Sequence, residues 1–298
     1  MTLLKVPSSF AKYGDHEAAS GIARIGLSSN GNSSRTIINH LKVRAPLLVQ
    51  RAMHPDTEWP AMAHVYVMSS AGGILQGDRL VVGIEAGENT ISRITTQSAT
   101  KIYRMEKGYA SQTIDITANA GSYVEFIPRQ LIPYRSSRFL QEVTISAAAG
   151  STVVYSETVS AGRTASGEKF DFDVCFLRMR ASDSKGRLLF ADVCNIEPSA
   201  LKRDALDRIF GGRTILSTIY ILSEKDIQPG IEQEISDAVG DKSMFAGCSS
   251  LPNECGLFVR VLDDSIDRIE ELTGAVTKIV RSHAIGRGIA KSVDPTVN

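Results

Sequence analysis

The sequence contains few of the residues and segments that mark several common protein classes. It has four cysteines with no C-x-x-C pair and a single tryptophan, and aromatic residues make up 6% of 298 residues. So few cysteines exclude a disulfide scaffold. No segment approaches 18 uninterrupted apolar residues, so we expect no membrane-spanning helix. The 33 basic and 33 acidic residues cancel, and the missing basic excess argues against nucleic-acid or anionic-membrane binding.

What is present indicates a folded protein that associates with others. Hydrophobic residues make up 43% of the chain, enough for a substantial core and too many for a disordered protein. A net charge of zero favours association, because molecules without net charge repel one another only weakly. Residues 1–7 lack the apolar stretch of a secretion signal, so we expect a cytoplasmic protein. No linker rich in Pro, Gly or Ser divides the chain, so we expect one domain over residues 1–298.

Alternation of apolar and polar residues dominates the chain from about residue 60 to 195 and predicts many short β-strands. We expect strands at about 80–84, 95–104, 114–116, 123–127, 139–146, 152–158, 169–176, 214–223 and 257–262. Turns rich in Gly, Asn and Asp separate these runs, which is typical of a sandwich, a barrel or a β-solenoid. No fixed sequence period supports a regular solenoid repeat.

Three segments have apolar residues at helical spacing and predict helices at about 199–211, 229–240 and 264–284. Ser199 is a candidate N-cap of the first, which we expect to stop at Gly211 and Gly212. Gly240 is the expected C-terminal glycine of the second. The predicted fold class is therefore mainly β, a single large β-rich domain with two or three packed helices.

Motifs for catalysis or for a resident metal are scarce. The five histidines form no H-x-H or H-x-x-x-H pair, and the densest polar group, at 54–58, fits a capped loop better than a metal site. The glycine-rich stretch at 69–78 lacks the Lys-Ser/Thr of a phosphate-binding loop and leads into a strand rather than a helix. No G-x-S-x-G nucleophile motif is present.

Two groups of polar residues are candidates for a specialised role. Asp78 and Glu168 each lie in a glycine-bounded turn, where a solvated carboxylate is the simpler interpretation. The run at 95–104 brings hydroxyls and an amide into a predicted strand, which then either faces water at a sheet edge or lines a polar interior such as a channel. The channel-lining candidates are Thr95, Thr96, Gln97 and Ser98.

The segment at 127–138 contains two prolines and three arginines. Prolines stiffen an extended segment, and arginine with tyrosine often anchors protein interfaces. An ordinary surface connection would have the same composition. The interface candidates in this segment are Arg129, Tyr134, Arg135 and Arg138.

Five pieces of the sequence, in order, resemble one known family. They are Ser69–Leu80, Thr95–Arg104, Pro128–Pro133, the Glu157…Gly162-Arg163…Gly167-Glu168 stretch and Leu251–Leu262. Together they resemble the urease accessory protein family UreD, also called UreH. The motif-bearing region covers most of about 60–265.

The resemblance implies a cytoplasmic maturation factor for the nickel enzyme urease rather than an enzyme. Family members bind the urease apoprotein and recruit UreF, which in turn docks the GTPase UreG. The resemblance also implies a stacked, helix-like β fold and an internal channel for transient Ni2+, with no tightly bound cofactor. On this hypothesis Asp78 and Glu168 are nickel-passage residues, with Thr95–Ser98 lining the channel. The region 199–240 and the C-terminal helix become candidates for the UreF contact.

The alternative is a β-sandwich or barrel that binds a carbohydrate or another small ligand. Sugar sites stack on aromatic rings, so the low aromatic content disfavours this class. A hydrolase with a site assembled from distant residues is a third interpretation, with no paired catalytic motif in its favour.

Overall fold

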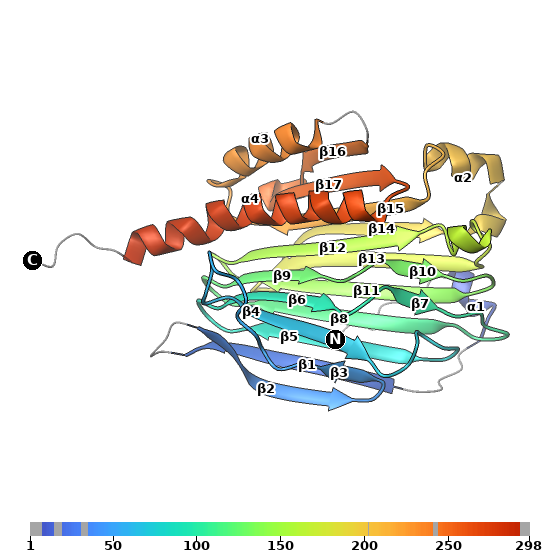
Figure 1. The fold of residues 1–298 in the computed structure, drawn as a ribbon, viewed down its shortest axis with the longest axis horizontal. Helices are drawn as coiled ribbons and strands as arrows, with labels where there is room; N and C mark the ends of the chain where they lie inside the picture. The colour runs from blue at the N-terminus through green and yellow to red at the C-terminus, as the bar shows by residue number, and fades with distance from the viewer. Residues whose placement is uncertain (1–7, 15–19, 31–34, 202, 241–243, 293–298) are drawn as a thin grey trace, which may run out of the picture.

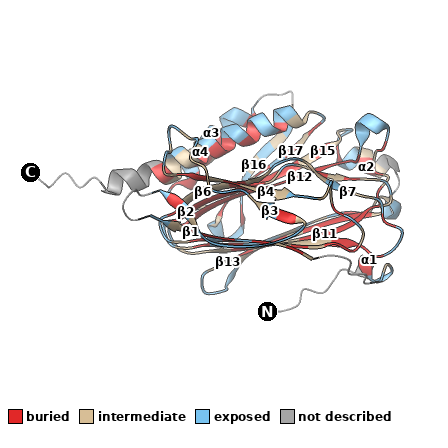
Figure 2. Cartoon of the chain, turned by 60° about the horizontal axis from the view of Figure 1, so that its bottom comes forward, coloured by how far each residue is buried: buried red, intermediate tan, exposed pale blue. Residues whose placement is uncertain are grey.

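The computed structural model describes residues 8–14, 20–30, 35–201, 203–240 and 244–292. Two β-sheets lie face to face, and two long helices cover the outer face of one sheet (Figures 1 and 2). The strands of both sheets carry many buried residues, which Figure 2 colours red, and their apolar side chains form one continuous core. No helix in these ranges has the length and apolar character needed to cross a membrane.

The first sheet has seven strands whose four inner pairings are parallel. In spatial order they are β14 (Leu188–Ile196), β13 (Val174–Asp183), β11 (Arg138–Ala147), β8 (Ala110–Ala118), β5 (Arg79–Ala86), β1 (Ser20–Ser29) and β2 (Thr36–Arg44). The outermost pairs, β13 with β14 and β1 with β2, are antiparallel.

The second sheet has ten strands. Its main path is β16 (Phe245–Ser250), β17 (Gly256–Asp263), β15 (Ile215–Leu222), β12 (Thr152–Ser160), β9 (Tyr123–Ile127), β6 (Ile91–Thr96), β4 (Ala63–Ser69) and β3 (Leu47–Val49). The short strands β10 (Leu131–Pro133) and β7 (Thr100–Ile102) pair beside β12. The pairs from β4 to β12 are parallel.

The chain passes repeatedly from one sheet to the other, from β5 to β6, from β8 to β9 and from β11 to β12. Each passage places a new strand beside the previous one in the same direction, so parallel ladders build up as in a β-solenoid. The predicted fold class, mainly β with stacked sheets and packed helices, is confirmed.

The described residues form four α-helices: α1 (Ser8–Ala11), α2 (Arg203–Ile209), α3 (Gln228–Val239) and α4 (Ile266–Ser292). They also form short 3₁₀ turns at Thr164–Ser166, Pro198–Ala200 and Pro252–Glu254. The second and third predicted helices exist, and α4 continues eight residues past the predicted end at 284. The first is shorter than predicted, because a separate 3₁₀ turn occupies Pro198–Ala200. Helix α3 ends at Gly240 as predicted, and this C-cap glycine has a right-handed φ of −64°.

Two predicted strands are wrong in part. The strand expected at 169–176 begins only at Val174, because Phe170 adopts a left-handed φ of 56° that no strand accommodates. Phe170 and Phe172 are nevertheless buried and reach the core from a loop. The strand expected at 95–104 is divided, since β6 ends at Thr96 and β7 starts at Thr100.

Helices α3 and α4 make a second core against the outer face of the ten-stranded sheet. Ile231 and Ile235 of α3 and Val276 and Val280 of α4 are buried there. Strand β12 is therefore covered on both faces, and all of its residues are buried. A polar side chain on β12 must consequently find its partners inside the protein.

Candidate functional site

A row of polar side chains crosses the otherwise apolar space between the two sheets. The strand register places Gln112 of β8 next to Gln141 of β11 in the first sheet. Opposite them, Tyr155 and Glu157 share one face of β12, because residues two apart in a strand point the same way. The inter-sheet polar row consists of Gln112, Gln141, Tyr155, Glu157, Cys194, Tyr220, Asp192 and Arg260.

The centre of the row is a hydrogen-bonded triad that joins the sheets. The Gln141 amide donates to Glu157 Oε2 over 2.8 Å and to the Tyr155 hydroxyl over 3.1 Å. The Tyr155 hydroxyl donates to the same carboxylate oxygen over 3.1 Å. These bonds keep Glu157 satisfied although it is buried.

Burial has a large electrostatic effect on Glu157. It raises the pKa of the carboxyl from 4.5 to about 7, against the opposing effect of the hydrogen bonds from Tyr155 and Gln141. Desolvation disfavours the charged form of an acid, which is the cause of this direction. Burial also raises the pKa of the Tyr155 hydroxyl well above its usual range, so at neutral pH the row contains a neutral phenol and a carboxyl near its titration midpoint.

One end of the row reaches the protein surface between β14 and β17. The Tyr220 hydroxyl donates to Asp192 Oδ2 over 2.8 Å, and Arg260 Nη2 donates to the same oxygen over 2.7 Å. The Arg260 side chain is about half exposed. Cys194 shares a face of β14 with Asp192, and burial raises the pKa of its thiol to about 12.

The other end of the row meets two neighbouring cavities that share Thr96, Thr100 and Gln112 in their walls. The larger has a volume of about 90 Å³ and reaches the exposed turn residues Gln97 and Ser98. The smaller, of about 20 Å³, continues inward to the Gln141–Tyr155–Glu157 triad. Because a water needs roughly 10–15 Å³, the inner cavity has room for one group of that size.

Stacked aromatic rings form a rigid wall beside the row. The rings of Phe126, Tyr155 and Tyr220 stack at centroid distances of 6.1 and 6.0 Å along consecutive strands, and Phe190 stacks on Tyr220 at 5.9 Å. Only the hydroxyls of the two tyrosines turn to polar partners. The row is thus a narrow line of polar groups bounded by aromatic side chains.

The four channel-lining candidates lie at different places. Thr96 borders both cavities. Gln97 and Ser98 are exposed and border the larger cavity. The Thr95 hydroxyl instead donates to the Ile127 carbonyl over 2.6 Å, and Thr95 borders a different cavity, of about 190 Å³, beneath α4. The structure therefore brings Thr96, Gln97 and Ser98 toward the row and separates Thr95 from them.

Asp78 and Glu168 are both buried, and each has local partners. The Leu75 amide donates to Asp78 Oδ2 over 2.8 Å, and burial raises the pKa of this carboxyl. Arg163 forms a two-point ion pair with Glu168, with distances of 2.9 and 2.5 Å, and lowers its pKa. Neither residue borders the two cavities beside the row.

The interface candidates differ in how much of each side chain remains available. Arg129 is exposed and pairs with Glu270 of α4, and Arg135 is exposed with a 3.4 Å contact to Asp171. Tyr134 lies between the Tyr103 ring and the Arg163 guanidinium. Arg138 is only 9% exposed, because its guanidinium bonds Asp173 over 2.7 Å and the Gly108 carbonyl over 3.1 Å.

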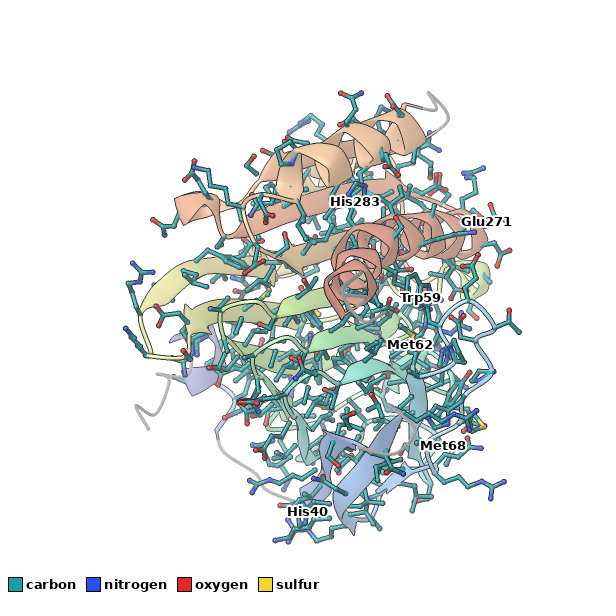
Figure 3. The ribbon with its side chains drawn as sticks, turned by 90° about the vertical axis from the view of Figure 1, so that its left-hand side faces the viewer. His40, Trp59, Met62, Met68, Glu271 and His283 are labelled. Atoms are coloured by element: carbon teal, nitrogen blue, oxygen red, sulfur yellow. The ribbon has the colours of Figure 1, made fainter. Side chains whose placement is uncertain are left out.

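A second buried ionic cluster fastens α4 to the sheet. Glu125 is fully buried and accepts hydrogen bonds from Arg281 of α4 over 2.5 and 2.8 Å, from Arg93 and from the Tyr123 hydroxyl. Arg281 also pairs with Asp56, in the loop whose Trp59 lies beside α4 in Figure 3. Asp56 is therefore a structural residue. In the described part of the chain, no three His, Cys, Asp or Glu residues converge to hold a metal ion.

From the sequence, Gln141 was not predicted as a functional residue, and Glu157 entered only as part of a stretch that resembles a known family, although the signal for both was present. Both lie in correctly predicted strands, and Glu157 is two residues from Tyr155, so the two share a face. Alternation does not predict how the two sheets pack face to face, and this packing brings Gln141 within hydrogen-bond distance of Glu157.

Comparisons with known proteins agree with each other. A family model described as UreD urease accessory protein matches residues 19–293. Urease accessory protein UreD 2 of Streptomyces griseus is 35% identical over 286 residues, covering 96% of both chains. UreD of Cenarchaeum symbiosum is 35% identical over 256 residues, covering 86% of this chain and 90% of the relative. UreD of Photorhabdus laumondii is 32% identical, covering 90% and 83%.

Proposed function

Because this chain belongs to the UreD family of urease accessory proteins, we propose that it binds the urease apoprotein and recruits UreF, and through it UreG, so that nickel reaches the urease active site. The family match extends over most of the chain and places the protein in urease maturation. An accessory role without catalysis of its own and a cytoplasmic location are parts of the same proposal.

The observation that carries the nickel-conduit part of the proposal is the inter-sheet polar row. It continues inward from a cavity at the surface and ends at a second surface position, beside Arg260. A divalent cation cannot cross an apolar core without polar groups to replace part of its hydration. The row supplies such groups along a line through the fold.

The chemistry of the row suits transport better than storage. Ni2+ ranks high among divalent first-row metals in affinity, so a site with several His or Cys ligands would retain it. The central triad offers an amide, a phenol and the single carboxyl of Glu157. A carboxyl whose pKa is about 7 releases its proton as a cation arrives and recovers the proton as the cation leaves.

Asp78 and Glu168 stay candidate nickel-passage residues under this proposal. Since both are held by local partners, the double substitution Asp78→Ala with Glu168→Ala tests them directly. Reduced urease activation with intact complex assembly supports their role. Activation and assembly equal to those of the wild-type protein would remove them from the path.

For UreF we propose the helical region that spans 199–240 together with α4. Helices commonly pack against helical partners, and exposed apolar side chains gather near α2, where Leu201, Ile209 and Phe245 lie open to solvent. Ile209→Glu should weaken UreF binding without affecting the core, because the side chain is exposed. Unchanged UreF binding by this variant and after removal of α4 would contradict the assignment.

Affinity purification of this chain, co-expressed with the urease subunits and UreF, tests the scaffold part of the proposal. We expect both partners to copurify. A well-behaved monomer that captures neither would reject it. Nothing favours the carbohydrate-binding alternative, because Phe245 is the one aromatic side chain that is exposed within the described ranges.

A further inference from the structure

One edge of the seven-stranded sheet is uncovered. Strand β2 pairs with β1 on one side, and no described strand pairs with its other side. Figure 1 shows it at the lower margin of the stack, and Figure 3 shows His40 on this strand at the lower edge. The backbone amide and carbonyl of Thr36, the first residue of β2, bond the Ala61 carbonyl and the His54 ring. Beyond Thr36 the unpaired edge of this nine-residue strand presents backbone donors and acceptors to any extended segment that approaches.

The same edge exposes apolar side chains that belong to the inter-sheet layer. Leu41 and Val43 are 43% and 44% exposed, yet they stand opposite Ile25 and Ala23, which are buried in the core. Leu41 and Val43 thus extend the apolar layer of the core from β1 onto the edge strand β2. An additional strand beside β2 would cover them.

The charged residues of β1, of β2 and of the segment directly after β2 are all basic. Residues 18–55 contain five Lys and Arg residues and no Asp or Glu. Arg35, Lys42 and Arg51 are exposed, and none has an acidic partner among the described residues. The opposite edge strand, β14, carries charges of both signs within and beside it, such as Asp192 and Arg187. Basic side chains alone would protect an edge from aggregation, but they do not explain the exposed Leu41 and Val43.

The charge also decides between two occupants of the edge. A second copy of this chain would place basic edges together, and like charges across a strand pair are unfavourable. An extended segment with acidic side chains would instead pair with Arg35, Lys42 and Arg51. We propose that β2 binds an extended acidic segment of the urease apoprotein as an added strand, an inference that rests on the function proposed above.

Binding of this kind combines three contributions. Backbone hydrogen bonds between β2 and the added strand give affinity. Every second side chain of the added strand would pack on Leu41 and Val43, which gives specificity. Complementary charge accelerates association and makes it sensitive to salt. All three are measurable on the intact complex.

The test compares hydrogen–deuterium exchange of the chain alone and in its purified complex with the urease apoprotein. We expect slower exchange of the amides of 36–44 in the complex. The double variant Arg35→Glu/Lys42→Glu should lower affinity about tenfold or more at low salt, with the difference shrinking at high salt. Lys185→Glu, in the exposed turn at the opposite edge, is the matched control and should bind like the wild-type protein.

The outcomes separate this inference from the function on which it rests. If the wild-type chain forms the complex while 36–44 exchange unchanged and the double variant binds normally, the edge proposal is wrong and the scaffold function stands. If slower exchange at 36–44 requires UreF rather than urease, the edge proposal is also wrong. If the wild-type chain forms no complex with urease, both proposals fail.

Discussion

At the scale of single residues, the polar row places a carboxyl among stacked aromatic rings. Burying a charge without full solvation is costly, and Glu157 limits this cost through bonds from Gln141 and Tyr155. The charged form is still disfavoured, which is why its pKa is raised to about 7. An apolar residue here would give a more stable core, so the carboxyl fits a role in function.

Glu157→Gln should therefore stabilise the protein in a pH-dependent way. The folded-state pKa of about 7 exceeds the ordinary value of 4.5, so the unfolded chain releases its proton first as the pH rises. Wild-type stability consequently falls between about pH 4.5 and 7. Relative to wild type, the variant should gain up to about 3 kcal/mol from pH 5 to pH 8, measured by urea unfolding.

The exposed Glu88 provides the control for this experiment. Glu88→Gln should leave the pH dependence of unfolding unchanged. If the free energies of unfolding of Glu157→Gln and wild type differ by the same amount at pH 5 and at pH 8, the Glu157 carboxyl is not desolvated, which would contradict the structure.

From the sequence, the strand face on which a residue lies is easier to predict than the residues that it contacts. Alternation in the strands at 139–146 and 152–158 places Tyr155 and Glu157 on one face, as the structure has them. Alternation also puts Thr95 and Thr96 on opposite faces of their strand, but it does not show that only the Thr96 face lies beside the row. That distinction depends on which face α4 covers, a property of tertiary packing.

At the scale of elements, the attachment of α4 depends on a fully buried carboxylate. Arg281→Met would leave Glu125 without its closest cation, and breaking one side of a buried ion pair typically costs about 3–5 kcal/mol. We expect a loss of stability of that size in urea unfolding. Arg129→Met, which breaks the exposed pair with Glu270, should cost less than about 1 kcal/mol. Equal effects of the two variants would contradict the buried network.

Two glycines in neighbouring elements predict opposite effects of the same substitution. At Gly256, at the start of β17, φ is 151° and an added Cβ would lie 1.8 Å from the Ile221 carbonyl oxygen, so Gly256→Ala should lower the melting temperature markedly. At Gly274 of α4 an added Cβ meets nothing within 4 Å. Gly274→Ala should stabilise the helix by about 0.5–1 kcal/mol. Thermal unfolding of both variants checks the pair, and a stabilising Gly256→Ala would contradict the local geometry.

Most strands are predictable at this scale because their apolar alternation is local. The misplaced start of β13 has a particular cause, since Phe170 and Phe172 alternate like strand residues while the left-handed φ of Phe170 breaks the strand. The pairing order is not predictable in the same way. Parallel neighbours such as β8 and β11 are joined only through β9 and β10 of the other sheet, and no repeat in the sequence marks that path.

At the scale of the whole molecule, the protein is a two-sheet stack with different surfaces on each side. Helices α3 and α4 cover one face, and β2 leaves one edge open (Figure 1). The polar row runs through the interior to the surface beside β14. These separate surfaces allow a scaffold to hold more than one partner while an interior path stays free.

The most direct test of this account uses Gln112, which borders both cavities. Gln112→Leu keeps the size of the side chain and removes its polar group. With the variant we expect normal copurification of urease and UreF but markedly less nickel per urease active site, measured by metal analysis of purified urease. Asn195→Leu, which removes an exposed amide from β14, should give full nickel content. Full nickel content with Gln112→Leu would contradict a path along the row.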